Sequence, residues 1–561
     1  MIRLAPAVAI VFLTAPVLFG LVGVVLPAFG WLPVLGGDSL SLEPWRQLAA
    51  QPGIGMSVVV SLLAGLATTA IALTVVMLFL AGAGNGRVYQ WVRRAVSPLL
   101  SMPHAAAAFG IAFLIAPSGL IARFLSPWAT GWERPADLLI VHDTLGLSMM
   151  LGLVVKEIPF LLLMSLAALP QIDPARRVAV ARSLGYRPVT AWLKAVAPSL
   201  YPLIRLPVYA VIAFSSSVVD VSLILGPTNP PTLAVSIIRW FHDPMLEMRF
   251  LASAGAVLQL GVTGLAMGLW WLAERLVGYC VRCWIERGAR VFCDSLLRFL
   301  GITLICLAVI LAAAGVVALV INSFAGFWRF PDALPQAFSL RQWNRAGPGV
   351  FQALGVTFTV GFLATAISVV LVMASLENEV RRARPSGQAA MRILYLPLIV
   401  PQIAFLFGIV TGAEAIGFRP GLALVVAGHV IFVLPYVYLS LSESYRQLDP
   451  RWVMVARTLG AGPNGAFWRV RLPMLLAPCL TAVAIGLAVS VGQYLPTQLM
   501  GAGRVPTVTT EAVALAAGGS RRIIGVWALV QALVPAVGFA LALMLPRLFY
   551  RNRRDLRDAA L

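Results

Sequence analysis

Residues with the types and spacing needed for catalysis are few in this sequence. The four histidines show neither HxxxH nor HExxH spacing, so they form no metalloenzyme motif. Cys280 and Cys283 form one CxxC with Cys293 nearby, but neither a His nor a fourth Cys lies close enough in sequence to complete a zinc site. There is no GxxxxGK[ST] phosphate loop, and the only lysines are Lys156 and Lys194. We therefore expect no catalytic residue, metal site or cofactor in this chain, and no ATP hydrolysis by it.

Asp220 is the most informative polar residue. It follows Ser217 inside a long apolar run, and the corresponding run of the second half places Gln493 at roughly the same position. An ionisable group inside a membrane costs free energy and is a functional candidate by default. Asp220, Gln493 and Ser217 are therefore candidates for a solute pathway, in which the carboxylate faces a cationic solute or a metal complex. The alternative is a hydrogen bond to neighbouring helices or a water-filled vestibule near the outer end.

Lys156 and Glu157 are adjacent residues of another apolar run. Adjacent side chains of a helix do not face one another, so these two are not expected to pair together. We expect a structural or gating ion pair with other spans rather than a solute site.

The composition indicates what kind of chain must position these residues. Of its 561 residues, 60% are hydrophobic and 11% are charged, and the mean hydropathy is +0.90. Soluble globular domains are about 45–50% apolar and about 25% charged. This surplus of apolar side chains excludes an ordinary cytosolic enzyme, a disordered chain and a small disulfide scaffold. It indicates an all-α, polytopic membrane protein.

Runs of about 20 apolar residues predict about twelve transmembrane helices. The first run is longer than the apolar region of a cleaved signal peptide, so we expect it to be retained. The predicted spans are residues 4–29, 56–82, 98–118, 144–168, 201–224, 251–273, 299–322, 351–375, 393–415, 421–441, 476–499 and 523–546.

The positive charge of the chain predicts its orientation. The net charge is +20, which would suggest nucleic acid as a partner of a soluble protein. With the N-terminus in the cytoplasm, 28 Lys and Arg residues fall in cytoplasmic segments and 12 in outer loops. Because cations collect in cytoplasmic loops, we expect both termini to be cytoplasmic, and no nucleic-acid partner.

The two halves of the chain resemble each other. Ser41-Leu42 with Trp45 recurs as Ser339-Leu340 with Trp343, and Leu66-Ala67-Thr68 recurs as Leu363-Ala364-Thr365. Each half has six predicted spans, so both enter the membrane in the same orientation, as a parallel repeat. We expect a first repeat at residues 1–274, a cytoplasmic linker at 275–298 and a second repeat at 299–561.

The cytoplasmic loop between spans four and five of each half is longer than a connector needs to be. The two loops cover residues 173–198 and 449–473. Asp followed by Pro is a good helix start, since the carboxylate caps free amides and Pro fits the first turn. Gly185 and Gly460 can end that helix in a left-handed conformation. Pro188 and Pro463 can each open a second short helix.

The second short helix has the composition of a docking element. It carries an aromatic residue and then a cation, and the distance from the Gly to the final Pro is 13 residues in both halves. Such a helix suits a groove on a soluble partner, whereas the alternative is an amphipathic helix lying on lipid. The residues concerned are Trp192, Lys194 and Pro198 in the first loop and Phe467, Arg469 and Pro473 in the second.

These loops resemble the EAA loop of ABC-importer permeases, whose pattern is Glu-Ala-Ala, three residues, Gly, nine residues, Ile-x-Leu-Pro. Ala181, Gly185 and Pro198 match it in the first loop, and Ala456, Gly460, Leu472 and Pro473 match it in the second. The chain departs from the pattern at the Glu, which is Ala179 or Met454, at the Ile, which is Ala195 or Val470, and at the first-half Leu, which is Ala197. The chain as a whole is similar to fused binding-protein-dependent permeases such as the ferric-iron, thiamine and YnjC-type permeases.

The resemblance implies a type I, MetI-like importer permease of a bacterial inner membrane. In that family the loop is a coupling helix seated in an ATPase subunit, so two copies of a cytoplasmic ATPase and an extracytoplasmic solute-binding protein are the implied partners. The expected solute is small, and Asp220 favours a cationic one such as thiamine, ferric iron or a polyamine. The alternative is a gradient-driven secondary transporter with two six-span halves. The paired loops favour the ABC permease.

Overall fold

The computed structural model describes residues 3–84, 86–290, 293–382 and 387–550, except for the side chains of residues 97, 388, 389 and 391. Regular structure in these ranges is helical. The first half contains α1 (Ala5–Ala28), α2 (Glu43–Ala50), α3 (Ile54–Ala83), α4 (Arg87–Ser101), α5 (His104–Ile115), α6 (Leu120–Leu125), α7 (Leu147–Ala168), α8 (Pro174–Ser183), α9 (Pro188–Ala195), α10 (Ala197–Ser217), α11 (Asp220–Leu225), α12 (Leu233–Phe241) and α13 (Met248–Glu286).

The second half follows the same order. It contains α14 (Asp294–Phe324), α15 (Arg341–Arg382), α16 (Gln388–Ile399), α17 (Gln402–Ala415), α18 (Leu422–Gln447), α19 (Arg451–Thr458), α20 (Pro463–Ala466), the π-helical turn η3 (Phe467–Arg471), α21 (Leu472–Met474), α22 (Leu476–Gly492), α23 (Leu495–Gly501), α24 (Val508–Ala514) and α25 (Arg521–Phe549).

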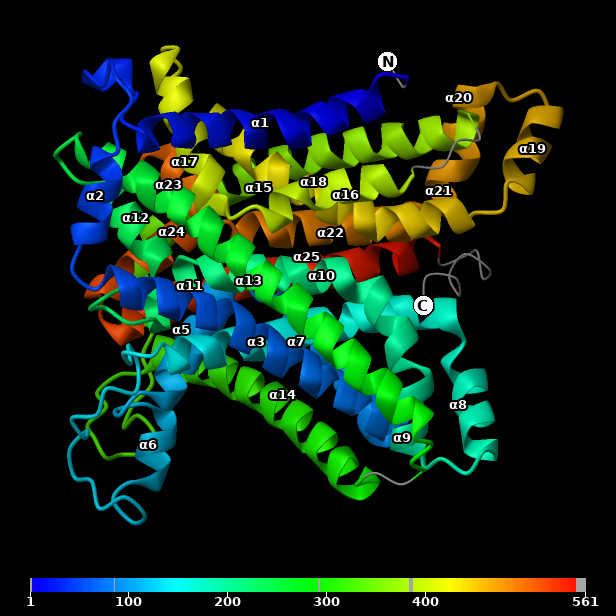
Figure 1. Cartoon of the computed structure of the whole chain (residues 1–561), viewed down its shortest axis with the longest axis horizontal. Helices are drawn as coiled ribbons and strands as arrows, with labels where there is room; N and C mark the ends of the chain where they lie inside the picture. Colours follow the sequence, from blue (N-terminus) through cyan, green and yellow to red (C-terminus); the bar gives the residue numbers. More distant parts are fainter. Residues whose placement is uncertain (1–2, 85, 291–292, 383–386, 551–561) are drawn as a thin grey trace.

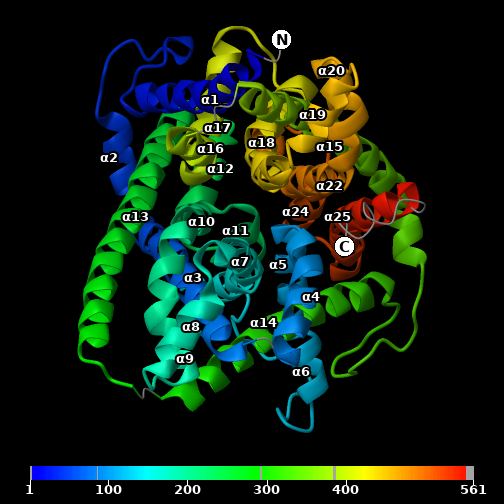
Figure 2. The same ribbon diagram turned by 90° about the vertical axis from the view of Figure 1, so that its right-hand side faces the viewer.

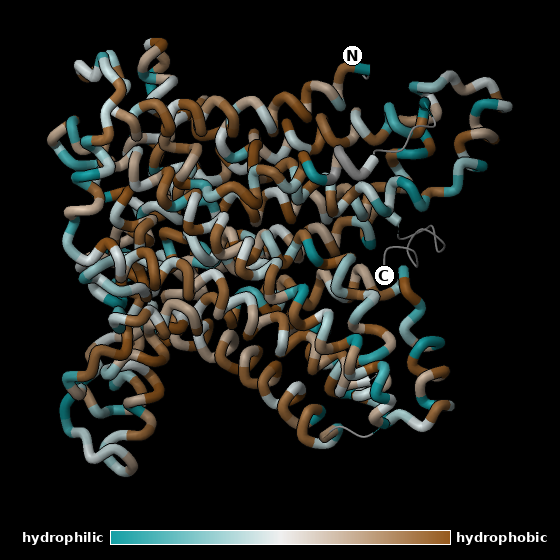
Figure 3. Tube along the Cα trace, viewed as in Figure 1, coloured by the Kyte–Doolittle hydropathy of each residue, from teal (hydrophilic) through white to brown (hydrophobic). Residues whose placement is uncertain are grey.

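The helices form one bundle whose long helices run roughly in the same direction (Figure 1). Ten helices in the described ranges are long and apolar enough to cross a membrane, and twelve are reached if two bent pairs each count as one span. One such pair, Arg392–Ile399 with Gln402–Ala415, is bent by 87°. Apolar residues dominate the length of the bundle, and hydrophilic ones gather towards its ends (Figure 3). The prediction of an all-α polytopic fold is confirmed.

The first helix of each half packs on the other half. Helix α1 contacts α17 and α15, and α14 contacts α5 and α3, so the two halves are interlocked. Both crossings depend on small residues. A Cβ added to Gly20 would lie 2.1 Å from the carbonyl oxygen of Phe405, and one added to Gly110 would lie 2.9 Å from the backbone of Gly315. Only glycine allows the backbones to approach this closely.

Predicted spans 98–118 and 393–415 divide between α4 and α5 and between α16 and α17, and two further predicted spans are broken. Residues 201–224 and 476–499 were expected to be continuous, but α10 ends at Ser217 before α11 begins, and α22 ends at Gly492 before α23 begins. In the first half the Ser217 hydroxyl, in the last turn of α10, donates to the Ala213 carbonyl at 2.7 Å. In the second half Pro496 lies in the first turn of α23, which it can start but not continue from α22. Asp220 therefore begins a short helix instead of lying within a span.

Candidate functional site: two loops at one end of the bundle

The two predicted loops project from the same end of the bundle. Helices α8 and α19 stand out from the right-hand end of the bundle in Figure 1. When that end faces the viewer, α8 and α9 lie to one side of the bundle and α19 and α20 to the other (Figure 2). The fold therefore presents one loop from each half on a single face.

The first loop folds as its sequence predicts. The Asp173 carboxylate accepts the backbone N–H of Arg176 at 3.3 Å, which caps α8. Gly185 follows α8 with φ +87°, a left-handed conformation that side chains other than those of Gly and Asn rarely adopt. Helix α9 then begins at Pro188.

The second loop has the same plan with a different inner helix. The Asp449 carboxylate accepts the backbone N–H of Arg451 at 2.9 Å, and Gly460 has φ +88°. A helix begins at Pro463, as predicted, but it widens into the π-helical turn η3 before α21. Such turns are rare and occur frequently at functional sites.

The outer helices α8 and α19 expose apolar side chains at their ends. Leu184, beside Gly185, is 60% exposed, and Leu459, beside Gly460, is 82% exposed. Val180 on α8 and Val455 on α19 are exposed too. Ala181 is buried and Ala456 is partly buried. Large apolar side chains are thus exposed at corresponding positions of the two loops.

The docking role predicted for Trp192 and Lys194 needs correction. Both side chains are buried against the chain itself, not presented to a partner. The Lys194 ammonium donates to the carbonyl oxygens of Trp284 and Ala289, at 2.9 Å each, and it lies over the Tyr186 ring. Burial lowers the pKa of Lys194 below its ordinary value. These residues hold α9 to the end of α13 and to the segment that follows it.

The N-terminus of α14 completes the attachment of the first loop. Its first residue, Asp294, is buried, and its carboxylate accepts the backbone N–H of Val189 at 2.8 Å and that of Thr190 at 3.3 Å. The Thr190 hydroxyl donates to the same carboxylate. The Asp294 side chain thus caps α9 from outside, and the first loop is fixed to the first helix of the second half.

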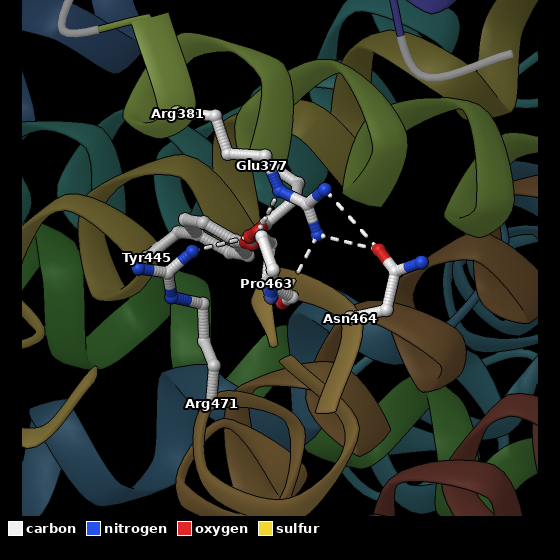
Figure 4. Close-up of polar contacts among 6 residues, drawn as sticks. All are labelled: Glu377, Arg381, Tyr445, Pro463, Asn464 and Arg471. Atoms are coloured by element: carbon white, nitrogen blue, oxygen red, sulfur yellow. Dashed lines mark hydrogen bonds and ion pairs between the residues drawn. The ribbon is translucent and has the colours of Figure 1, made fainter. Parts of the chain in front are cut away.

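A different cluster attaches the second loop (Figure 4). Glu377 of α15 is buried, and its carboxylate accepts hydrogen bonds from Arg471 of the loop and from Tyr445 of α18. Arg381, one turn along α15, donates to Glu377 at 2.6 Å and to the Asn464 side chain at 3.2 Å. One buried carboxylate therefore joins two membrane helices to the inner part of the loop.

The other predicted loop residues occupy mixed positions. Phe467 is partly buried, its ring 5.1 Å from that of Trp468, and Arg469 is exposed. Pro198 is exposed, whereas Pro473 is partly buried and its carbonyl accepts the Tyr550 hydroxyl. Of the two predicted cations, Arg469 alone faces outward.

The predicted pathway residues lie at the breaks between helices. The Asp220 side chain is buried at the start of α11, within electrostatic range of His104 and of Tyr494. Tyr494 is the residue after Gln493, so the structure brings together the two breaks that the sequence relates. The Ser217 hydroxyl is committed to its own helix.

Glu157 and Lys156 interact with different elements, as expected for adjacent residues. The Glu157 carboxylate lies 3.2 Å from Nε2 of His104, and both belong to the first half. The Lys156 ammonium donates to the carbonyl oxygens of Leu99 and Leu100 at the end of α4, at 3.1 and 2.8 Å. Lys156 thus caps a helix and has no carboxylate bound in the described ranges.

Asp294, Glu377 and Arg471 were not found by sequence reasoning. Asp294 lies in the predicted linker, and Glu377 lies just beyond the predicted span 351–375. The sequence feature that could have indicated Asp294 and Glu377 is an acidic residue at one end of a long apolar run. Cys280, Cys283 and Cys293 are free thiols, and the described residues contain no group of three or more His, Cys, Asp or Glu side chains placed to bind a metal ion.

Comparison with known proteins shows which family the chain is similar to. Residues 371–552 match the family described as "Binding-protein-dependent transport system inner membrane component". The chain is 31% identical to the inner membrane ABC transporter permease protein YnjC of Escherichia coli (strain K12), over 92% of this chain and 93% of that protein.

More distant relatives match one half or less. The chain is 27% identical to the "Putative 2-aminoethylphosphonate transport system permease protein PhnV" of Salmonella typhimurium (strain LT2), over 34% of this chain and 77% of that protein. It is 29% identical to a spermidine/putrescine transport system permease protein PotC homolog of Mycoplasma genitalium, over 16% of this chain and 32% of that protein. The chain belongs to the binding-protein-dependent family of ABC transporter permeases, and it is a multi-pass inner membrane transport subunit rather than an enzyme.

Proposed function

We propose that this chain forms the solute pathway of an ABC importer and that its two loops, residues 173–198 and 449–473, transmit the movements of a separate ATPase. The observation that carries the proposal is the pair of loops on one face of the bundle, each with an exposed outer helix and an inner helix bonded to the membrane helices. A partner that binds one conformation of the bundle more tightly shifts its population towards that conformation.

The two loops support one ATPase subunit under each half. Each outer helix exposes a leucine beside its glycine, so two copies of one partner can bind equivalent surfaces. In this proposal the face with α8 and α19 and both termini are cytoplasmic, and an extracytoplasmic protein delivers solute at the other end. The repeats correspond to residues 1–274 and 299–561. Residues 551–561 lie outside the described ranges.

The proposed solute is small and cationic, in the class of thiamine, ferric iron or a polyamine. The Asp220 carboxylate is buried in the first half. The position in the second half that corresponds to Asp220 is the neutral Gln493. An acidic group from one half opposite a neutral group from the other favours a positively charged solute. The spermidine/putrescine name of one relative agrees with this class.

Gentle purification of the tagged chain from its native membrane tests the proposal. We expect two copies of an ATPase with a phosphate loop per chain, measured as the mass of the intact complex. Capture of the intact chain without an ATPase, repeated after mild cross-linking, would contradict it and would favour the gradient-driven transporter. An Arg341→Gln/Arg345→Gln variant serves as the control and should capture the same ATPase, because both arginines are exposed at the start of α15, away from the loops.

A further inference from the structure

A cavity at the end of the bundle opposite the loops is lined by three arginines. It has a volume of about 230 Å³ and lies between the turn after α5, the end of α14 and the start of α25. Arg123, Arg521 and Arg522 line it together with Ser118 and Ser520. Residues from both halves therefore contribute to one positively charged cavity.

Arg123 is buried without an ion-pair partner in the described ranges. Its guanidinium donates to the carbonyl oxygens of Ser118 at 3.1 Å, Arg329 at 2.9 Å and Asp332 at 3.1 Å, and it lies 4.3 Å from the Trp328 ring centroid. The Asp332 carboxylate is within electrostatic range but accepts a hydrogen bond from Gln336. Carbonyl groups and an aromatic ring hold this guanidinium in place, and no bound carboxylate neutralises it.

The other two arginines add charge that the chain does not compensate. Arg521 is close enough to Arg123 for their charges to repel, and it donates one hydrogen bond to the Ser118 hydroxyl at 2.7 Å. Arg522 has no hydrogen-bond or ion-pair partner among the residues described. Both lie in the first turn of α25, where the helix dipole disfavours cations. An anion in the cavity would remove the repulsion and satisfy the free donors.

The surroundings of the cavity are those of a membrane interface. Beside it, Ile121 and Phe124 of α6 and Trp128 after it expose their apolar side chains. Aromatic residues of this kind collect at the level of lipid headgroups. Guanidinium groups match the geometry of phosphate oxygens through paired N–H donors.

We propose that this cavity binds a phosphate group, supplied by a phospholipid headgroup or by a free phosphate ion. Arg521 and Arg522 donate hydrogen bonds to the phosphate, and the Arg123 guanidinium, held in place by carbonyl groups, contributes a fixed positive charge. The site is separate from the coupling loops, so it stands whether or not the proposed coupling holds.

Binding of defined phosphates to the full-length, delipidated chain tests this site. The probes are dioctanoyl phosphatidylglycerol and inorganic phosphate, each titrated and followed by native mass spectrometry and by isothermal calorimetry. We expect Arg521→Gln/Arg522→Gln to weaken binding at least about tenfold. The Arg341→Gln/Arg345→Gln variant loses the same charge at exposed positions of α15 and is expected to bind as the unmodified chain does.

The outcomes separate the two sources. Variant-sensitive binding of phosphatidylglycerol alone would identify a lipid headgroup, and variant-sensitive binding of inorganic phosphate would identify a free anion. Binding of neither probe by the unmodified chain would overturn the proposal. Equal affinity in both variants would overturn it as well. A melting temperature unchanged in Arg521→Gln/Arg522→Gln would show that the loss of binding is not a loss of fold.

Discussion

The carboxylate of Asp294 accepts the backbone N–H of Val189 at 2.8 Å. Asp294 begins the first helix of the second half, and Val189 lies in the inner helix of the first loop. Helix α14 continues from this contact along α3 and α5 of the first half and reaches α25 of the second. A displacement of the first loop therefore acts directly on a helix that packs against both halves.

Replacing Asp294 with Asn tests this connection. The amide keeps one acceptor oxygen but loses the charge that two backbone N–H groups and the Thr190 hydroxyl share. A hydrogen bond to a charged group contributes about 1.5–3 kcal/mol, against about 0.5–1.5 kcal/mol for one between uncharged groups, so loss of the charge weakens the contact. We expect a lower melting temperature in detergent and reduced ATP-driven uptake, whereas Asp38→Asn, at an exposed position, should change neither. Unmodified uptake and melting in Asp294→Asn would show that the contact is dispensable.

Glu377 should be more sensitive to substitution than Asp294. Glu377→Gln leaves the buried Arg471 guanidinium without a counter-charge, which costs about 3–5 kcal/mol. We expect strongly reduced amounts of folded chain, measured by size-exclusion chromatography of the detergent-extracted protein. Glu443→Gln, on the exposed side of α18, is the matched control.

A double variant separates the charge from the shape of the cluster. Replacing both members of a buried ion pair with uncharged residues is often neutral for stability. Glu377→Gln/Arg471→Met should therefore fold better than Glu377→Gln alone. If the double variant were the less stable of the two, the uncompensated charge of Arg471 would not be the cause of the defect.

Replacing the loop glycines Gly185 and Gly460 is predicted to impair transport without impairing membrane insertion. Gly185→Val/Gly460→Val places branched side chains at φ +87° and +88°, where they are strained whatever the space around them. A Cβ at Gly460 would meet open space, and one at Gly185 would lie 3.4 Å from the Arg290 side chain. We expect the chain to insert normally and uptake to be lost, measured by membrane content and solute accumulation. Asn tolerates a left-handed conformation, so Gly185→Asn/Gly460→Asn should keep part of the activity.

Gly462 provides the matched control for this pair. It lies two residues after Gly460, has φ −63° and has open space around its Cα. Gly462→Ala should therefore leave uptake unchanged. Normal uptake in Gly185→Val/Gly460→Val would contradict the proposal that the loops couple the bundle to an ATPase.

Asp220 is predicted to select the charge of the solute. Asp220→Asn removes the carboxylate but keeps the size of the side chain, so we expect uptake of a cationic solute to fall at least about tenfold. The melting temperature should stay near that of the unmodified chain, and Asp220→Glu should retain part of the uptake. Undiminished uptake in Asp220→Asn would place the solute pathway elsewhere.

The sequence predicted most of the architecture because apolar runs and loop motifs are local patterns. The starts at Asp173 and Asp449 and the turns at Gly185 and Gly460 needed only neighbouring residues, and all four are confirmed. The break after Ser217 was not predicted because Val218 and Val219 continue the apolar run.

Contacts between distant segments could not be predicted in this way. Trp192 and Lys194 had the composition of a docking surface, yet carbonyl groups near residue 284 bind the Lys194 ammonium from 90 residues away. The pairing of Glu377 with Arg471 spans 94 residues. The described residues of the first half contain no equivalent pair at the loop, which Asp294 fixes instead. Such contacts depend on how the helices pack against one another, and local patterns in a single sequence do not reveal this packing.

Photo-cross-linking from the two exposed leucines tests the central proposal most directly. A photoreactive residue is introduced at Leu184 or Leu459 in the native membrane, with Trp192 as a buried control and Phe351 as an exposed control on α15. The proposed coupling predicts that both leucine positions cross-link to the same soluble ATPase with a phosphate loop, and that neither control does. Cross-links from Leu184 and Leu459 to lipid alone, or equal ATPase capture from Phe351, would contradict it.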